Sequence, residues 1–125
     1  MKLVDTTIAV DHLRGAEAAT ELLQQLVEED ETIAASEVTR FELLAGVREN
    51  ELEALEHFFA ALSWVPVDEP VARAAGALAR KHRAAYAGVD DADYLIAATA
   101  MLLEADVLTT NARHFPMFSG LQPPY

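Results

Sequence analysis

The apolar positions of this chain form short runs that alternate with longer stretches of helical spacing. Residues 2–4 and 32–35 are short apolar runs, and each is followed by side chains of the types that cap helices. Between them, residues 17–29 carry apolar side chains three and four positions apart, which is the spacing of one helix face. The pattern predicts strands at 2–4, 32–35, 64–67 and 107–109, and helices that end near residues 14, 29, 48, 62, 85 and 104.

The alternation of strands with helices defines the fold class. Parallel strands need long crossover connections, and helices supply them. We therefore expect an α/β protein with three layers, in which a central, mainly parallel sheet of four to five strands is flanked by helices. The length of 125 residues fits one domain over residues 1–125, and the proline-containing tail is expected to have little regular structure.

Composition narrows the class of protein further. Hydrophobic residues make up 52% of the chain, too many for a disordered protein in spite of a net charge of −12. The absence of cysteine excludes disulfides and thiolate-ligated metals. The start, MKLVDTT, has an acid where an export signal needs apolar residues, and the longest apolar run, 94–103, is too short for a bilayer. We expect a soluble, cytoplasmic protein with no membrane partner.

The excess of acidic over basic residues also limits how the protein could bind nucleic acids. Nine Lys and Arg residues stand against 21 Asp and Glu residues, which argues against a general nucleic-acid-binding surface, since phosphate contacts need clustered cations. It does not exclude an enzyme that acts on nucleic acid, because a bound metal ion can neutralise the carboxylates of a site.

Four polar side chains are candidates for a site beyond the carboxyl ends of the predicted strands, where open α/β sheets bind ligands. They are Asp5, Glu42, Asp93 and Asn111. Asp5 directly follows the first strand and Asn111 follows the last, so either could also have an ordinary role as a helix cap or a turn residue. Thr6 could cap in place of Asp5, which would leave the charge of Asp5 for a site.

Glu42 combines a charge with an apolar neighbourhood. It lies one helical turn from Val38 and Ala45 and near the same stripe as Phe41, so the pattern places a carboxylate on an apolar helix face. Such a carboxylate costs desolvation free energy unless it has a partner. Two interpretations stay open at this stage: an inward functional carboxylate, or a residue at the edge of the stripe with its head group in water.

Three acids open the last predicted helix, where the helix dipole and free N–H groups favour carboxylates. Asp90 is the natural cap, and Asp91 is expected to be exposed. Asp93 shares its stripe with Ala97 and Ala100, small residues that indicate close packing. We therefore expect Asp93 to point inward.

The chemistry that these donors predict is that of a hard metal ion. Donors that are all oxygen atoms suit Mg²⁺ or Mn²⁺ rather than zinc. One or two such ions can activate a water and neutralise the charge that develops on a phosphodiester. Other chemistries lack their motifs, since there is no Gly-rich phosphate loop and no G-x-S-x-G, and the four histidines have no metal-ligand spacing.

Two other classes of α/β protein are excluded at single positions. A phosphatase of the haloacid-dehalogenase type needs a second aspartate two residues after Asp5, where Thr7 stands. A receiver domain needs an acidic pair at the first strand and a lysine after a late strand, but Asp5 is alone and no lysine follows 107–110.

Four segments of the chain match a set of known motifs in order and spacing. They are LVDTTIAVDHLRG, AASEVTRFELLAGVR, DADYLIAATA and LTTNARHF. They resemble the motifs of the PIN-domain family, and within it the VapC toxins of toxin–antitoxin pairs. The resemblance implies a PIN-like fold, a Mg²⁺- or Mn²⁺-dependent endoribonuclease with one or two ions, a small antitoxin as partner and a homodimer.

The resemblance also assigns roles to residues. Its motifs carry the acids over to Asp5, Glu42 and Asp93, with Asp5 and Asp93 as principal metal ligands and Glu42 ligating the metal or orienting the attacking water. The fourth position falls on Asn111, where many relatives have aspartate, so a neutral ligand stands there. Further candidates for an outer shell or for contacts with RNA are Thr6, Thr39, Thr109, Arg40, Arg48 and Arg113.

Two alternatives stay open beside the toxin ribonuclease. The neutral Asn111 is compatible with a catalytically weak PIN-like binding module held by an antitoxin. The same motifs are also compatible with a PIN nuclease that acts in RNA processing without a toxin role.

Overall fold

The computed structural model describes residues 1–125 and is built on one sheet of four parallel strands. The strands are β1 (Lys2–Val4), β2 (Ile33–Ser36), β3 (Ser63–Val65) and β4 (Asp106–Leu108), in the order β3-β2-β1-β4. All three pairs of neighbouring strands are parallel. The predicted parallel sheet is confirmed, with four strands. Because all strands run the same way, their carboxyl ends lie at one edge of the sheet.

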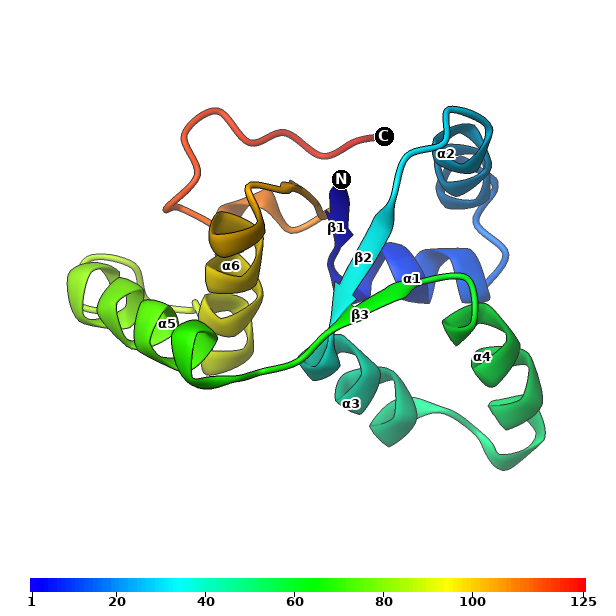
Figure 1. Ribbon diagram of the computed structural model, residues 1–125, viewed down its shortest axis with the longest axis horizontal. Helices are drawn as coiled ribbons and strands as arrows, with labels where there is room; N and C mark the ends of the chain where they lie inside the picture. The colour runs from blue at the N-terminus through cyan, green and yellow to red at the C-terminus, as the bar shows by residue number, and fades with distance from the viewer.

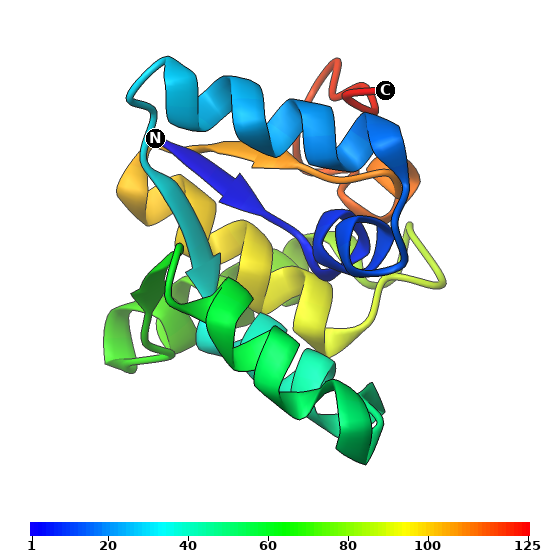
Figure 2. The same ribbon diagram turned by 90° about the vertical axis from the view of Figure 1, so that its right-hand side faces the viewer.

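Six α-helices cover both faces of the sheet. They are α1 (Thr6–Leu13), α2 (Glu17–Glu28), α3 (Glu37–Gly46), α4 (Leu52–Phe59), α5 (Glu69–His82) and α6 (Asp91–Leu103), with two 3-10 turns, η1 (Glu49–Glu51) and η2 (Ala112–His114). α5 and α6 lie on one side of the strands, and α1, α2 and α4 lie on the other (Figure 1). Figure 2 shows β1 leading directly into α1. None of the helices is long and apolar enough to cross a membrane.

Strand side chains alternate between the two faces and build a core on each. Leu3 is fully buried in a cluster with Ile96 of α6 on one face. Val4 is buried with Ile8 of α1 and Leu23 of α2 on the other. This follows from the period of a strand, in which successive side chains point to opposite faces. The two cores hold α1 and α6 on either side of β1, so the ends of both helices meet near the end of that strand.

Several elements are shorter than the sequence predicts. β3 ends at Val65 rather than at residue 67, because Pro66 has no N–H to donate to the ladder. α3 ends at Gly46 rather than at residue 48, since Val47 has an extended backbone and glycine is a poor helix former. α4 ends at Phe59, three residues early.

The segment after β4 packs more closely than the sequence predicts. Phe115 is fully buried in the cluster of Leu3 and Ile96, and the ring of Phe118 lies against it with centroids 6.4 Å apart. The tail lacks helices and strands beyond one short turn, as expected, but its aromatic side chains complete the core on the α6 face.

Candidate functional site

A cavity of about 380 Å³ opens at the carboxyl ends of β1 and β4. Its walls come from the β1–α1 junction, the middle of α3, the start of α6 and the loop after β4. Twelve residues line it: Asp5, Thr6, Thr7, Val10, Asp11, Arg14, Glu42, Asp90, Asp93, Thr110, Asn111 and His114. We call this cavity the acidic pocket. It brings together the four residues that the sequence proposes for a site, Asp5, Glu42, Asp93 and Asn111.

Asp5 is both a helix cap and a wall of the acidic pocket. Its side chain is 5% exposed. Oδ1 accepts the N–H of Thr6 at 2.8 Å, which caps α1. Oδ2 accepts the hydroxyls of Thr109 at 2.7 Å and Thr7 at 3.2 Å. The two roles weighed for Asp5 are therefore compatible, because each carboxylate oxygen has its own donors.

The threonines behind Asp5 join the first and last strands. The Thr7 hydroxyl accepts the N–H of Thr110 at 3.2 Å, and the buried Thr109 hydroxyl accepts the N–H of Asn111 at 3.0 Å. The loop after β4 is thus fixed to the start of α1 by side chains rather than by sheet pairing. Thr109 acts from behind Asp5 and does not line the pocket, whereas Asn111 does.

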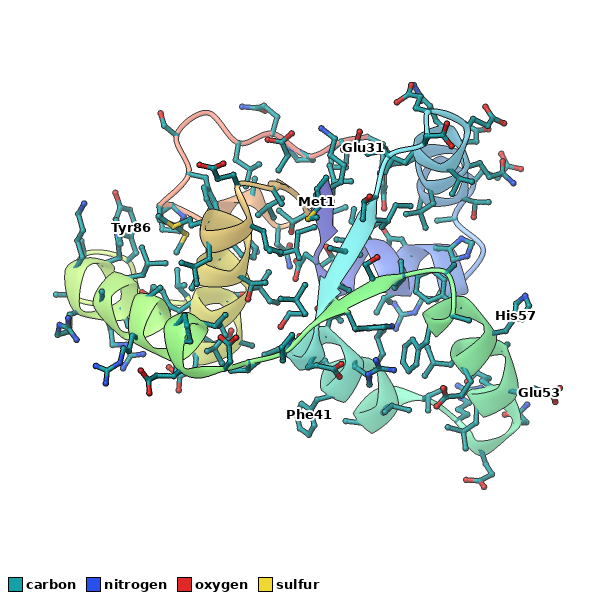
Figure 3. The ribbon with its side chains drawn as sticks, viewed as in Figure 1. Met1, Glu31, Phe41, Glu53, His57 and Tyr86 are labelled. Carbon is teal, nitrogen blue, oxygen red and sulfur yellow. The ribbon has the colours of Figure 1, made fainter.

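Glu42 enters the acidic pocket from α3. Its Oε1 accepts the Thr6 hydroxyl at 2.7 Å, and the same hydroxyl lies 3.3 Å from that of the buried Thr39. Glu42 is half-buried, so it shares features of both interpretations: its head group bonds Thr6 inside the pocket, and its functional role stays a prediction. The predicted apolar stripe is wrong. Phe41 is 70% exposed and projects away from the molecule (Figure 3). The buried face of α3 carries Thr39 and Leu43 instead, and Glu42 lies at its edge.

Asp93 points inward from the first turn of α6, as predicted, and is 8% exposed. It forms a reciprocal capping box with Asp90, in which each backbone N–H donates to the other carboxylate at 3.2–3.3 Å. Burial is the main cause that raises the pKa of Asp93, and with the neighbouring carboxylates of Asp90 and Asp5 it brings this pKa to about 7. His114 Nδ1 lies 3.4 Å from Asp93 Oδ2. Asp91, by contrast, is exposed, as expected.

Three arginines named as candidate RNA contacts lie outside the acidic pocket. Arg40 donates to Glu37 at 2.6 Å, and its guanidinium lies 4.0 Å from the centroid of the Trp64 ring. That side chain therefore joins α3 to β3 instead of reaching toward a ligand. Arg113 is exposed and lines neither the acidic pocket nor a second cavity that lies beside it between α1, α3 and α4. Arg48 lines that neighbouring cavity.

Sequence reasoning missed the contribution of α1 to the pocket. Val10, Asp11 and Arg14 line it along with Thr6 and Thr7. These positions are three and four residues apart, so they form one face of α1. Helical spacing counted from the residues just after Asp5 would have found Arg14.

The donor set of the acidic pocket fits a divalent cation chemically. Asp5, Glu42 and Asp93 offer carboxylate oxygens to one cavity, and Asn111 adds a neutral carbonyl oxygen. The pKa of Asp93 is raised mainly by burial and also by the nearby carboxylates of Asp90 and Asp5, and a bound cation would favour its ionised form. No three of the His, Asp and Glu side chains are arranged to hold one ion as they stand. Ligation by all three carboxylates therefore requires side-chain rotation.

A model of the PIN domain family matches residues 2–119, and the chain belongs to the PIN-domain family. Among curated proteins, it is 65% identical to ribonuclease VapC19 of Mycobacterium tuberculosis over the full length of both chains. It is 38% identical to ribonuclease VapC10 of the same species, covering 100% of this chain and 93% of that one. The family resemblance found in the sequence is confirmed.

Solved structures share the fold. The crystal structure of VapBC2 from Rickettsia felis, bound to a DNA fragment from its promoter, superposes with a TM-score of 0.83 at 22% identity, covering 98% of this chain and 96% of that chain. FitAcB from Neisseria gonorrhoeae superposes with a TM-score of 0.77 at 26% identity, covering 92% and 91%. The sheet and its flanking helices are therefore an arrangement that this family has in experimental structures.

Proposed function

We propose that this chain is a Mg²⁺- or Mn²⁺-dependent endoribonuclease, the toxin of a type II toxin–antitoxin pair, formed by one PIN domain over residues 1–125. The observation that carries the proposal is the meeting of Asp5, Glu42 and Asp93 in one cavity. The full-length identity of 65% to ribonuclease VapC19 supports the substrate class.

In this proposal Asp5 and Asp93 hold the metal, Glu42 completes the site and Asn111 contributes a neutral oxygen. A bound divalent ion would supply an activated water and neutralise the charge that develops on the phosphodiester. Thr109 and Thr7 fix the orientation of Asp5. Thr6 holds Glu42 by its hydroxyl, so Glu42 can rotate toward the ion or toward the water only within the reach of that hydrogen bond.

The test is a metal titration with the purified chain and single-stranded RNA. We expect cleavage that rises with Mn²⁺ or Mg²⁺ and stops in chelator. Sequencing of RNA ends after induction in cells then gives the target. A folded chain that shows no cleavage at any metal concentration would instead be a binding module, an alternative that the neutral Asn111 favours. Cleavage with no effect on growth would point to RNA processing without a toxin role.

The proposed partner is a small antitoxin in the cytoplasm. The acidic pocket, in a chain of net charge −12, should attract a cationic side chain to the place of the metal, and an Arg or Lys in an amphipathic C-terminal segment would supply it. The complex should weaken as Mg²⁺ is raised, because both compete for the same carboxylates. Pull-downs at low and high Mg²⁺ test this, and a partner indifferent to metal would contradict it.

A homodimer is the proposed assembly of the toxin itself. The exposed Phe41 and Leu44 on α3 support it, since large apolar side chains in contact with water favour association. Light scattering on the purified chain, with Phe41→Ser as a variant, measures the mass directly. A monomer in the parent would contradict the assembly and leave the ribonuclease proposal unchanged.

A further inference from the structure

A second cavity lies directly beside the acidic pocket, between α1, α3, η1 and α4. Its volume is about 440 Å³. Val10, Arg14 and Glu42 line both cavities, so the two adjoin each other along α1. Half of its ten lining residues form an apolar wall: Val10, Leu13, Leu43, Val47 and Leu55.

Two arginines make the lining of this cavity less acidic than that of the acidic pocket. Arg14 and Arg48 line it, both are exposed, and neither forms an ion pair. They balance Glu42 and Glu51, the two acids of the same lining, whereas acids dominate the acidic pocket. Guanidinium groups bind phosphate oxygens in bidentate geometry. The cavity therefore offers an apolar wall and two free anion-binding groups.

We infer that this cavity is a nucleotide subsite for single-stranded RNA and takes the base of a nucleotide next to the cleaved bond. The inference rests on the proposed ribonuclease function and adds how the RNA is held. The base packs on the apolar wall, and Arg14 and Arg48 bind the phosphates that flank it. Because Arg14 lines both cavities, the phosphate that it binds neighbours the one presented to Asp5 and Asp93.

The lining favours RNA over a peptide as the occupant. An apolar peptide segment would satisfy the apolar wall but would leave Arg14 and Arg48 without partners. A nucleotide satisfies both, since it joins a flat base and an anionic phosphate through one sugar. Single-stranded RNA also presents unstacked bases, which duplexes do not.

Gly46 allows the cavity to be filled without disturbing the core. It ends α3, lines the cavity, and a Cβ built there meets no atom within 4 Å. Gly46→Leu should weaken the binding of a short mixed-sequence single-stranded RNA about tenfold, and Gly46→Ala much less. Fluorescence anisotropy with Ca²⁺ in place of Mn²⁺ measures Kd with little cleavage. A Kd unchanged in Gly46→Leu overturns the inference.

The arginines are tested by the salt dependence of the same binding. Arg14→Ala with Arg48→Ala should lower the slope of log Kd against log salt by about 1.4, at about 0.7 for each single-strand phosphate contact. The control is Arg80→Ala with Lys81→Ala, which removes the same charge from α5, on the far side of the sheet (Figure 1). If the control lowers the slope equally, the effect is general electrostatics and the subsite is overturned.

Two further outcomes separate this inference from the proposed function. A parent chain that cleaves RNA, with a KM unchanged by Gly46→Leu, keeps the function and overturns the subsite. If Gly46→Leu releases a small protein partner while the Kd for RNA is unchanged, the cavity binds a peptide, and the inference is likewise overturned. A parent that neither binds nor cleaves RNA overturns both.

Discussion

The two sides of the acidic pocket hold their carboxylates in opposite ways. On the β1 side, Asp5 accepts three hydrogen bonds, two of them from threonine hydroxyls. On the α6 side, Asp93 accepts one backbone N–H from Asp90, lies 3.4 Å from His114 Nδ1, and faces the charges of Asp90 and Asp5. Both side chains are buried. Equal burial thus has different consequences, because one carboxylate has its donors and the other has like charges.

The difference indicates which half of the pocket depends on a cation. Asp5 is oriented by the chain itself, whereas burial and the nearby carboxylates disfavour the ionised form of Asp93, which a bound cation would stabilise. Under the proposed function, the stability lost on the α6 side accompanies metal binding, as is common where function requires buried charge. Four experiments test this difference between Asp5 and Asp93, and the first has the largest expected effect.

Removing the carboxylate on either side of the pocket should reduce RNA cleavage to the same extent. Asp5→Asn and Asp93→Asn keep the shape of each side chain and remove one anionic ligand, so RNA cleavage should fall by about a thousandfold or more in each. Single-turnover cleavage in Mn²⁺ measures it. Asp91→Asn is the control, since Asp91 is exposed and pairs with Arg83 outside the pocket. Substantial cleavage by either variant would remove that residue from the site.

Without metal, the same two substitutions should change the free energy of unfolding in opposite directions. Folded Asp93 keeps its proton up to a pH of about 7, whereas the unfolded chain releases it near 3.8, so the folded state binds more protons between these values and loses stability as pH rises through them. Asp93→Asn removes that loss and should be more stable than the parent at pH 8 by about 2 kcal/mol.

The matching change on the β1 side is Asp5→Asn, which should lower stability by about 1–2 kcal/mol at both pH 5 and pH 8, because charge-assisted hydrogen bonds are weakened. Urea unfolding of both variants in chelator provides the comparison. A loss of stability in Asp93→Asn at pH 8 would mean that Asp93 is chiefly a structural cap.

Thr109→Val tests the hydroxyls behind Asp5. It keeps the shape of a fully buried side chain, removes the donor to Asp5 Oδ2 and leaves the N–H of Asn111 without its acceptor. Stability should fall by about 1–2 kcal/mol, and cleavage by about tenfold because Asp5 is no longer held. Thr99→Val is the control, since its buried hydroxyl bonds only Leu95 within α6. Thr109→Ser should restore cleavage, which a purely packing role would not predict.

The smallest effect is expected at Asn111, where the two sides meet. Asn111→Asp adds an anionic oxygen to the pocket and should strengthen Mn²⁺ binding about tenfold. It should also lower stability in chelator slightly, because it adds one more like charge. Calorimetry on the parent and the variant measures the affinity. An unchanged affinity would place Asn111 outside the metal shell.

Much of the fold and of the acid set could be predicted because both depend on local sequence. The strands are short apolar runs with caps after them, and Asp5 follows its strand directly. Asp93 could be placed inward because Ala97 and Ala100 mark the packed face of α6. These signals need no knowledge of distant neighbours.

The sequence-based predictions fail where the position of a side chain depends on packing against distant segments of the chain. Phe41 is apolar but exposed, since α3 turns Thr39 and Leu43 toward the core, and the spacing of apolar residues alone could not choose between these faces. The burial of Phe115 depends on its packing against Leu3 of β1 and Ile96 of α6, which come together only in the folded chain. Arg40 could not be assigned for the same reason, because its partner Trp64 comes from another element.

The pairing of β1 with β4 sets the time at which the pocket forms during synthesis. Asp5 and Glu42 emerge from the ribosome early, but β1 gains its second neighbour only when residue 108 has been made. Asp93, Thr109 and Asn111 also belong to this late part of the chain. A fragment that ends before Asp93 therefore has two of the three acids, Asp5 and Glu42, and lacks the threonine that follows β4, so it lacks the pocket. Only chains translated past Asn111 can form it.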